Sequence, residues 1–438
     1  MITKAKRILA LLLAALMIFT MAGCESEGVK KNDELFVPDL SGTTQSKTVV
    51  ITASEEHQTI QGFGGINFPC WIDDLTKEQR DTAFKNGEDQ LGFTILRIQV
   101  DPNKSNWERE LETAKAAQKE GLLIFASPWN PPDSMCERFN RNGNANAKRL
   151  RHDKYAEYAE HLNDFVTFMR DNGVELYAIS IQNEPDFADE WTWWSTDEIM
   201  DFILNYSDAI DCRIMTPESF QYRKDYYNAI LNNEEALSKI DIFGTHFYGT
   251  QKWDMRYPLF EEKGEGKELW MTEVYVPDSS SDADTWPQAI DVAVNIHDGM
   301  TTGNMQAYVW WYIRRFYGPM KEDGTISKRG YMMAHFSKFV RPGYVRIGAT
   351  ESPAFDAGVS VSAYKGDNKI VIVAINHTLT TYGQKFELPD AGSISYIEAY
   401  TTTKSENLAR TGNVAFEDGS FSYVLPPESV TTFVVEVE

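Results

Sequence analysis

The chain has 438 residues, a formal net charge of −23 at pH 7 and an aromatic content of 13%, including 11 tryptophans. Such an acidic surface argues against nucleic acids or other polyanions as general partners, so an acidic substrate would need a dedicated local cation. The length exceeds one small domain and fits a barrel with a satellite domain, and the many aromatic rings suit either a large core or sugar binding.

The first 23 residues have the features of an export signal. Basic residues at positions 4, 6 and 7 precede an apolar run over residues 8–21, which ends in small residues before Cys24. A basic start, a short apolar run and a small-residue exit are typical of a signal peptide, and the run is too short for a comfortable membrane span. We therefore predict that residues 1–23 are a signal peptide and that the protein works outside the cytoplasm.

The residues Met21-Ala22-Gly23-Cys24 resemble a bacterial lipobox, in which the cysteine is lipidated and becomes the mature N-terminus. This predicts a cell-surface lipoprotein anchored through Cys24, with ordinary secretion and cleavage nearby as the alternative. Residues 24–47 are rich in Ser, Gly, Lys, Asp and Thr and show no sustained periodicity, which is typical of a linker.

Between residues 60 and 335, short apolar strands alternate with longer amphipathic segments. In residues 153–170, apolar residues recur every three or four positions, as in a helix with one buried face. Eight strands that alternate with helices predict an α/β fold, a (β/α)8 TIM barrel, as the catalytic domain. The predicted strands are Ile60–Gly65, Thr94–Val100, Leu122–Ser127, Leu176–Gln182, Arg213–Pro217, Ile240–His246, Glu268–Glu273 and Gln306–Tyr312.

After residue 335 the pattern changes to short alternating strands. Residues 359–364 alternate, residues 365–368 have turn chemistry, and residues 369–374 form an apolar run, which together predict a β-hairpin. We predict an antiparallel β-sandwich side domain from residues 336–438, joined by residues 48–59 from ahead of the barrel.

Two glutamates follow the apolar runs of the fourth and seventh predicted strands. Glu184 follows Asn183 and precedes Pro185, which prevents a simple continuation of the strand, while Glu273 ends the seventh strand. Active sites of these barrels lie at the carboxyl ends of the strands. Two carboxylates that face each other across a sugar can hydrolyse a glycosidic bond, one as proton donor and the other as nucleophile or base. Each glutamate could instead cap a helix or pair with an arginine.

Further segments narrow this interpretation to a family. They are Gln61-Gly62-Phe63-Gly64-Gly65, Ser127-Pro128-Trp129-Asn130-Pro131-Pro132, Gly244-Thr245-His246-Phe247-Tyr248-Gly249, Trp270-Met271-Thr272-Glu273 and Trp310-Trp311-Tyr312-Ile313-Arg314-Arg315. From about residue 49 to the end, the chain resembles glycoside hydrolase family 30, specifically its bacterial glucuronoxylan-specific endoxylanases. The resemblance implies that Glu184 is the acid/base, Glu273 the nucleophile, and the anomeric configuration retained, which requires carboxyl groups about 5–5.5 Å apart.

Several neighbouring residues are candidates for binding the sugar chain. Asn183 is expected to donate to a sugar 2-hydroxyl, a bond that strengthens as charge develops at the anomeric carbon. The Tyr248 hydroxyl is a candidate to orient the nucleophile. Trp129, Phe187 and Trp311 offer ring faces for xylose, with core packing as the alternative for each.

Arg315 is the predicted specificity residue. The family resemblance assigns it to the carboxylate of a 4-O-methylglucuronic acid branch, with Tyr275 and Tyr317 adding hydroxyl groups. A guanidinium offers a carboxylate two parallel hydrogen bonds, and a structural salt bridge is the alternative. Asp278 and Phe316 depart from the family pattern: an anion at Asp278 would weaken the binding of a carboxylate unless it faces away, and Phe316 would reshape the subsite.

The sequence therefore predicts a secreted retaining endo-β-1,4-xylanase directed by glucuronate branches. The alternatives are a sibling enzyme that cleaves plain xylan, β-1,6-glucan or a glucosylceramide-like substrate, and a non-catalytic surface glycan-binding lipoprotein. No phosphate-binding glycine loop or metal spacing occurs, so we expect no cofactor or metal, and His246 is expected only as a hydrogen-bonding partner. We expect a monomer without a nucleic-acid partner, in contact with the membrane only through its lipid.

Overall fold

The computed structural model describes residues 33–187, 191–350 and 358–438. The predicted signal peptide and the lipidation site Cys24 lie outside the described residues. Within these ranges, no helix combines the length and the apolar character that a membrane crossing requires.

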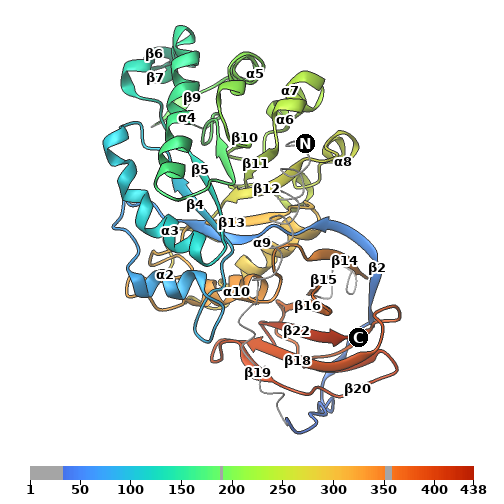
Figure 1. Ribbon diagram of the computed structural model, residues 1–438. Coiled ribbons are helices and arrows are strands. Elements are labelled where there is room, and N and C mark those ends of the chain that lie inside the picture. The colour runs from blue at the N-terminus through green and yellow to red at the C-terminus, as the bar shows by residue number, and fades with distance from the viewer. Residues whose placement is uncertain (1–32, 188–190, 351–357) are drawn as a thin grey trace, which may run out of the picture. The chain divides into compact units, whose positions relative to one another are not determined.

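Eight parallel strands close into a barrel in the described part of the chain, which confirms the predicted fold class (Figure 1). The strands occur in chain order around the barrel, and the last pairs with the first. They are β3 (Gly62–Ile66), β4 (Ile95–Gln99), β5 (Leu123–Ser127), β8 (Ala178–Ser180), β10 (Ile214–Ser219), β11 (Ile242–His246), β12 (Glu268–Glu273) and β13 (Ala307–Tyr312). All eight coincide with predicted strands.

Glycines allow β3 to pack closely against its neighbour. A Cβ atom on Gly64 would lie 1.8 Å from the carbonyl oxygen of Ile95 in β4, so no larger residue fits there. Inside the barrel, apolar side chains such as Ile95, Phe125, Met215 and Trp270 form a separate core cluster. The barrel is thus filled by side chains, and its chemistry is confined to the strand ends.

Helices cover the outside of the barrel through their apolar faces. Along α4, Tyr158, Leu162 and Phe165 are fully buried, and α5 begins at a capping box in which Ser195 and Glu198 satisfy each other's backbone amides. The helices are α2 (Lys77–Phe84), α3 (Leu111–Lys119), α4 (Tyr155–Asp171), α5 (Thr196–Asn205), α6 (Lys224–Leu231), α7 (Glu234–Lys239), α8 (Pro258–Lys263), α9 (Ile290–Thr301) and α10 (Lys328–Ser337).

The side domain is a mostly antiparallel β-sandwich. Its strands follow one hydrogen-bonded path, β19–β18–β22–β16–β15–β14–β2–β17–β21–β20, with β1 beside β17. The rings of Phe386 and Phe421 pack against Phe433 between the two layers. The strands are β1 (Thr44–Gln45), β2 (Val49–Thr59), β14 (Val345–Ala349), β15 (Val359–Gly366), β16 (Lys369–Asn376), β17 (Tyr382–Glu387), β18 (Ile394–Thr402), β19 (Ala409–Thr411), β20 (Phe416–Glu417), β21 (Ser420–Leu425) and β22 (Ser429–Val437).

Two details refine the predictions for this domain. The hairpin of β15 and β16 forms as predicted, and β2, ahead of the barrel, pairs with both β14 and β17. The second half of the predicted linker is not a free tether, because Phe36 bridges to Val414 and β1 pairs in parallel with β17. Amino-acid composition did not predict this edge-strand pairing, because polar residues can form a short edge strand when a partner backbone is available.

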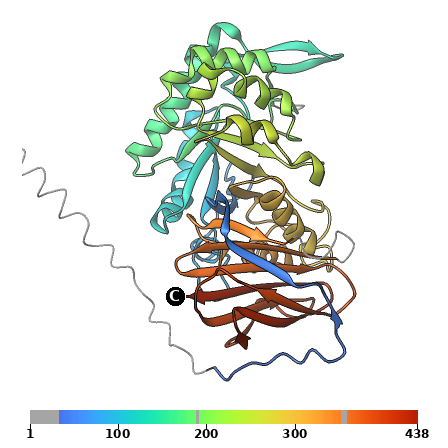
Figure 2. The ribbon, with the colours of Figure 1, turned by 90° about the vertical axis from the view of Figure 1, so that its right-hand side faces the viewer.

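The side domain packs on the barrel through α9 and α10, which contact β15, β16, β18 and β22 (Figure 2). His335 of α10 lies at this contact, with Nδ1 2.8 Å from the Thr432 hydroxyl and Nε2 2.9 Å from the Thr402 hydroxyl. Burial lowers the pKa of His335 to about 3, so the imidazole is neutral there.

One three-stranded sheet was not predicted. It joins the hairpin of β6 (Cys136–Arg141) and β7 (Asn144–Leu150), which follows the third barrel strand, to β9 (Thr192–Trp193), which follows the fourth. Its strands are short and polar, so they carry little hydrophobic periodicity. The sheet ties the loop after β5 to the loop that carries Glu184.

Candidate active site

Glu184 and Glu273 meet at the carboxyl end of the barrel. Their side chains come from the ends of β8 and β12, and the two residues are 4% and 5% exposed. One carboxylate oxygen of each, together with a ring nitrogen of His246, lie within 4.8 Å of one another. The two carboxylates are therefore close enough to act on one sugar.

The chain leaves β8 in a strained conformation that turns Glu184 into the site. Its φ is +46°, a left-handed value that is uncommon for a residue with a side chain. The Asn183 N–H donates to the Pro128 carbonyl over 2.9 Å, and the Glu184 N–H donates to the Glu218 carbonyl over 3.1 Å. Two neighbouring strand ends thus hold the backbone of the predicted acid/base.

Glu273 accepts hydrogen bonds from two side chains. Tyr248 donates its hydroxyl hydrogen to Oε1 over 2.8 Å, and Arg97 donates through Nη1 to Oε2. Charge-assisted bonds of this kind favour the ionised carboxylate. The predicted part of Tyr248, orienting Glu273, matches this contact.

Arg97 and Glu218 form a buried ion pair beneath the two carboxylates. Arg97 Nη2 lies 2.9 Å from Glu218 Oε1 and 2.5 Å from Asn183 Oδ1, and its guanidinium carbon is 4.8 Å from the centre of the Trp129 ring. Burial by itself would raise the pKa of Glu218, but the charge of Arg97 and contacts with His246 lower it to about 2. Glu218 is therefore ionised near neutral pH.

Glu184 has the opposite environment. Its Oε1 lies 2.9 Å from His246 Nδ1. Burial and the nearby charge of Glu273 raise the pKa of Glu184 to about 7, against the lowering effects of His246 and Arg97. Burial lowers the pKa of His246, but the nearby carboxyl groups of Glu273, Glu184 and Glu218 raise it more. The pKa of His246 is therefore raised to about 9. Burial thus keeps a proton on Glu184 near neutral pH, while Glu273 accepts hydrogen bonds from a guanidinium and a hydroxyl.

Glu184, His246 and Glu273 are the only group of three possible metal-binding residues that converge in the described ranges. Arg97 already donates to Glu273, and His246 is already bonded to Glu184 through Nδ1. The cations that balance these carboxylates are therefore protein groups, and the donor set suits proton transfer better than a metal ion.

One row of aromatic rings includes Tyr248, which donates to Glu273, and Tyr317, which lies near Arg315. Neighbouring rings in this first row lie 4.1–5.7 Å apart between centres. Asp186 positions part of it by accepting hydrogen bonds from the Ser219 hydroxyl and the Phe220 N–H. Phe187 is 42% exposed, so its outer face is available. The first aromatic row consists of Phe187, Phe220, Tyr248, Tyr275, Tyr317 and Phe316.

A second row includes Trp129, whose ring lies against the Arg97 guanidinium, and it ends at the exposed Trp71. Trp129 is only 2% exposed and Trp311 9%, so both are mainly packing residues with little free face. The exposed ring is Trp71, at 51%, which stacks on Phe68 with centres 4.2 Å apart. The second aromatic row consists of Trp71, Phe68, Trp129, Trp311 and Tyr312.

Arg315 has no carboxylate within ion-pair distance among the described residues. Its Nε is buried and has no hydrogen-bond partner there, and its guanidinium carbon is 5.7 Å from the centre of the Tyr312 ring. Burial raises the pKa of Tyr317 to about 12, against the opposing charge of Arg315 nearby. A cavity of about 410 Å³ lies beside Arg315 and Trp71. A structural salt bridge, the alternative for Arg315, is not formed within the described chain.

Arg314 and Asp278 have hydrogen-bond partners of their own, although Arg314 also lines the cavity beside Arg315. Arg314 donates to Gln79 Oε1 over 2.8 Å and to backbone carbonyls of the loop before α2. The Asp278 carboxylate accepts hydrogen bonds from Ser280 and Ser281, which lower its pKa to about 2. The anion is thus bound within its own loop and makes no described ion pair with Arg315.

Four contributors to the site escaped the sequence argument: Arg97, Glu218, Phe220 and Trp71. Arg97 left one signal, a charge inside the mostly apolar predicted strand Thr94–Val100. Glu218 lies one residue beyond the predicted end of its strand, at Pro217. A buried Arg329 was also missed, and it joins the loops after β12 and β13 by donating to the carbonyls of Asp278 and Tyr317.

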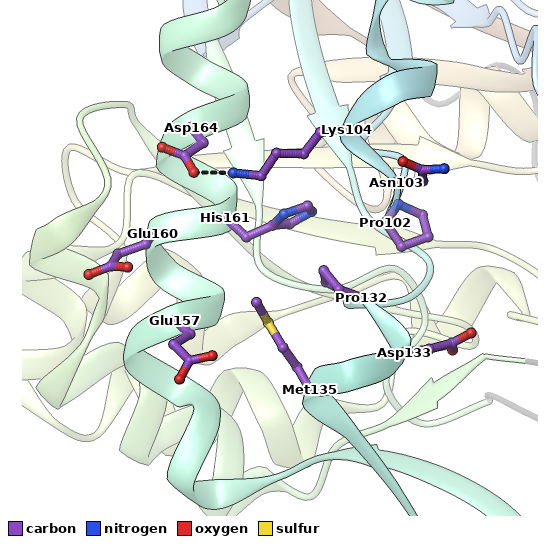
Figure 3. A pocket seen from close by; sticks show the side chains of 10 residues that line it. All are labelled: Pro102, Asn103, Lys104, Pro132, Asp133, Met135, Glu157, Glu160, His161 and Asp164. Atoms are coloured by element: carbon purple, nitrogen blue, oxygen red, sulfur yellow. Dashed lines mark hydrogen bonds and ion pairs between the residues drawn. The ribbon is translucent and has the colours of Figure 1, made fainter.

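A second cavity, of about 600 Å³, lies between α4 and the loops after β4 and β5 (Figure 3). Figure 3 shows His161 pointing into it and Lys104 paired with Asp164. Burial lowers the pKa of His161 to about 4, so the ring is neutral. None of the residues lining this cavity belongs to the carboxylate cluster, and we give it no part in the reaction.

The chain matches no protein-family model. It is 58% identical over 399 residues to a glucuronoxylanase of Bacillus subtilis (strain 168), which covers 91% of this chain and 94% of that protein. An endo-1,6-β-D-glucanase of Aspergillus fumigatus is 26% identical over 313 residues, or 61% of each chain.

Two solved structures extend the likeness to the fold. A family GH30 endoxylanase from Clostridium papyrosolvens C71 aligns with a TM-score of 0.84 at 44% identity, covering 89% of this chain and all of that one. A glycoside hydrolase family 30 subfamily 8 xylanase from Clostridium acetobutylicum aligns with a TM-score of 0.79 at 36% identity over the same shares. With these relatives and a paired-carboxylate site at the barrel mouth, the chain belongs to glycoside hydrolase family 30, in the branch of the bacterial glucuronoxylanases.

Proposed function

We propose that the protein is a retaining endo-β-1,4-xylanase that cleaves glucuronoxylan. The observation that carries the proposal is the asymmetric pair of carboxylates within 4.8 Å. Glu273 accepts hydrogen bonds from Tyr248 and Arg97, and burial raises the pKa of Glu184 to about 7. Such a pair separates the two roles that glycoside hydrolysis needs.

In the first step, Glu273 attacks the anomeric carbon and forms a glycosyl–enzyme ester. Glu184 gives its proton to the departing glycosidic oxygen, so the leaving chain departs as a neutral alcohol. Asn183 supports this step, because its amide nitrogen is buried and has no partner among the described residues. That N–H is free to donate to the 2-hydroxyl of the sugar as positive charge develops at the ring.

In the second step, the ionised Glu184 takes a proton from water, and the resulting hydroxyl attacks the anomeric carbon. The ester bond breaks and Glu273 returns to its anion, to which Arg97 and Tyr248 donate. Two inversions at one carbon retain the configuration. Trp71, Phe187 and the other exposed rings of the two aromatic rows supply faces for neighbouring xylose units.

Arg315 determines where on the polymer the enzyme binds, through the uronate branch. Its guanidinium is without a described anionic partner, Tyr317 lies near it, and Tyr275 contacts Tyr317 in the first aromatic row. A uronate carboxylate is a suitable anionic partner, because it can accept two parallel hydrogen bonds from the guanidinium. The Asp278 carboxylate accepts hydrogen bonds from Ser280 and Ser281 of its own loop, and it makes no described ion pair with Arg315.

The function is coupled to export. The N-terminal residues 1–23 have the pattern of a signal peptide and Cys24 that of a lipidation site. Polymeric xylan is too large to enter a cell, so cleavage outside the cytoplasm fits the substrate.

A digest of glucuronoxylan beside linear arabinoxylan tests the proposal. We expect cleavage of the decorated polymer with the uronate at a fixed distance from each new reducing end, because the branch sets the cleavage position. Glu273→Ala should reduce kcat by about 10⁵-fold or more while leaving the thermal midpoint within about 3 °C. Equal cleavage of both polymers with uronate at random positions would contradict the branch-directed function and leave plain xylanase activity.

A further inference from the structure

Glu218 is a third glutamate at the centre of the site, and the double displacement gives it no part. It is completely buried at the end of β10, with a left-handed φ of +51°. The pairing of β10 with β11 shifts register between Pro217 and Ser219, so Glu218 is the extra residue of a β-bulge. Bulges beside active sites re-aim a side chain, and here the bulge turns Glu218 into the barrel mouth.

The neighbouring strand leaves space for this side chain. A Cβ on Gly244 would lie 2.9 Å from Glu218 Cγ, so β11 needs a glycine at that position. The carboxylate then accepts from Arg97 over 2.9 Å at Oε1 and from the Ser127 hydroxyl over 2.8 Å at Oε2. His246 Nε2 lies 3.7 Å from Oε1.

The two cationic neighbours of Glu218 each contact one of the two carboxylates of the proposed mechanism. Arg97 donates to Glu273, and His246 is bonded to Glu184. The backbone carbonyl of Glu218 also accepts the Glu184 N–H. One residue therefore links both halves of the proposed mechanism without facing the substrate.

The charges explain why an anion is needed at this position. Arg97 and a protonated His246 are two buried cations, and Glu273 alone would balance one of them. With Glu218 ionised and Glu184 protonated, two anions balance two cations. Without Glu218, a buried positive charge is left uncompensated, and His246 is the partner that can release a proton.

We propose that Glu218 is a positioning residue that holds Arg97 and His246 as cations against the nucleophile and the acid/base. The inference rests on the proposed function for the roles of Glu184 and Glu273. It assigns to Glu218 no contact with the sugar and no proton transfer to it.

Glu218→Gln tests the proposal because it keeps the shape and removes the charge. We expect kcat on glucuronoxylan to fall about 10²–10³-fold with KM changed less than about threefold, since positions near the sugar are untouched. In imidazole nitrogen NMR of the full-length protein, the His246 midpoint should fall from about 9 to below about 8. The signal that disappears in the His246→Gln variant is assigned to His246.

Two further variants separate charge from structure. Glu218→Asp restores the charge, so it should recover at least about tenfold of the lost kcat and return the His246 midpoint toward that of the wild type. Glu110→Gln removes another fully buried carboxyl, one with no described hydrogen-bond partner, outside the cluster. It should leave kcat and the His246 midpoint unchanged. If Glu218→Gln does not fold, the comparison of Glu218→Asp with the wild type carries the test.

An unchanged His246 midpoint in folded Glu218→Gln would overturn the proposal, as would a kcat within about threefold of the wild type. So would a loss of activity in Glu218→Asp as large as in Glu218→Gln, because shape alone would then account for both. The NMR measurement needs no substrate. A wild-type protein that fails to cleave xylan would sink the proposed function while leaving the His246 midpoint to decide the part of Glu218.

Discussion

His246 Nδ1 lies 2.9 Å from Glu184 Oε1, while Glu273 Oε1 accepts a hydrogen bond from the Tyr248 hydroxyl over 2.8 Å. The two carboxylates therefore have different partners although they lie within 4.8 Å of each other. The partner of Glu184 can gain and lose a proton, whereas a tyrosine hydroxyl keeps its proton throughout the working range. This difference supports the proposed roles of the two glutamates.

The first prediction concerns pH. The pKa of Glu184 is raised to about 7, first by burial and then by the charge of Glu273. A raised pKa means that the carboxyl keeps its proton up to neutral pH, so kcat/KM should decline as pH rises through about 7. A substrate with a nitrophenol leaving group needs less protonation and should lose less activity there. A decline centred near 4–5, as for an ordinary glutamate, would contradict this environment.

The second prediction concerns the hydroxyl on the nucleophile. Tyr248→Phe removes the 2.8 Å donor to Glu273 but keeps the ring in the first aromatic row. A hydrogen bond to a charged group contributes about 1.5–3 kcal/mol, so kcat should fall about 10- to 100-fold. KM should change little, because ring stacking is preserved. A matching rise in KM with kcat unchanged would show instead that the hydroxyl binds the sugar.

The barrel was predictable because eight apolar runs at regular spacing leave few other folds. The carboxylates were predictable because polar residues that end such runs gather at one rim. Arg97 and Glu218 were not, since nothing local shows that a charge in β4 and a bulge in β10 face each other across the barrel. Trp129 and Trp71 show the same limit: sequence identifies aromatic rings, but only packing decides that Trp129 is buried and Trp71 exposed.

The third prediction concerns substrate choice. Arg315→Ala should reduce kcat/KM on glucuronoxylan by about 30- to 100-fold, because a bidentate partner of the uronate is lost. Activity on linear xylan should stay within about threefold. Arg314→Ala is the matched control, since Arg314 donates to Gln79 and to the loop before α2. It should lower the thermal midpoint and leave the ratio of the two activities unchanged. Equal losses on both polymers in Arg315→Ala would show a structural part for Arg315.

The fourth prediction concerns stability in acid. His335 is buried between Thr402 and Thr432 with its pKa lowered to about 3, whereas an unfolded histidine titrates near 6.5. The unfolded chain therefore binds a proton that the folded protein rejects, and this group's stabilisation is lost as pH falls below about 6.5. Between pH 7.5 and 5.5 the loss from this one group is about 1.4 kcal/mol. Urea unfolding of the wild type and of His335→Gln at both pH values isolates it, because all other titrating groups are common to the two proteins. The free energy of unfolding should decline more in the wild type, and equal declines would mean that His335 is already protonated in the folded state.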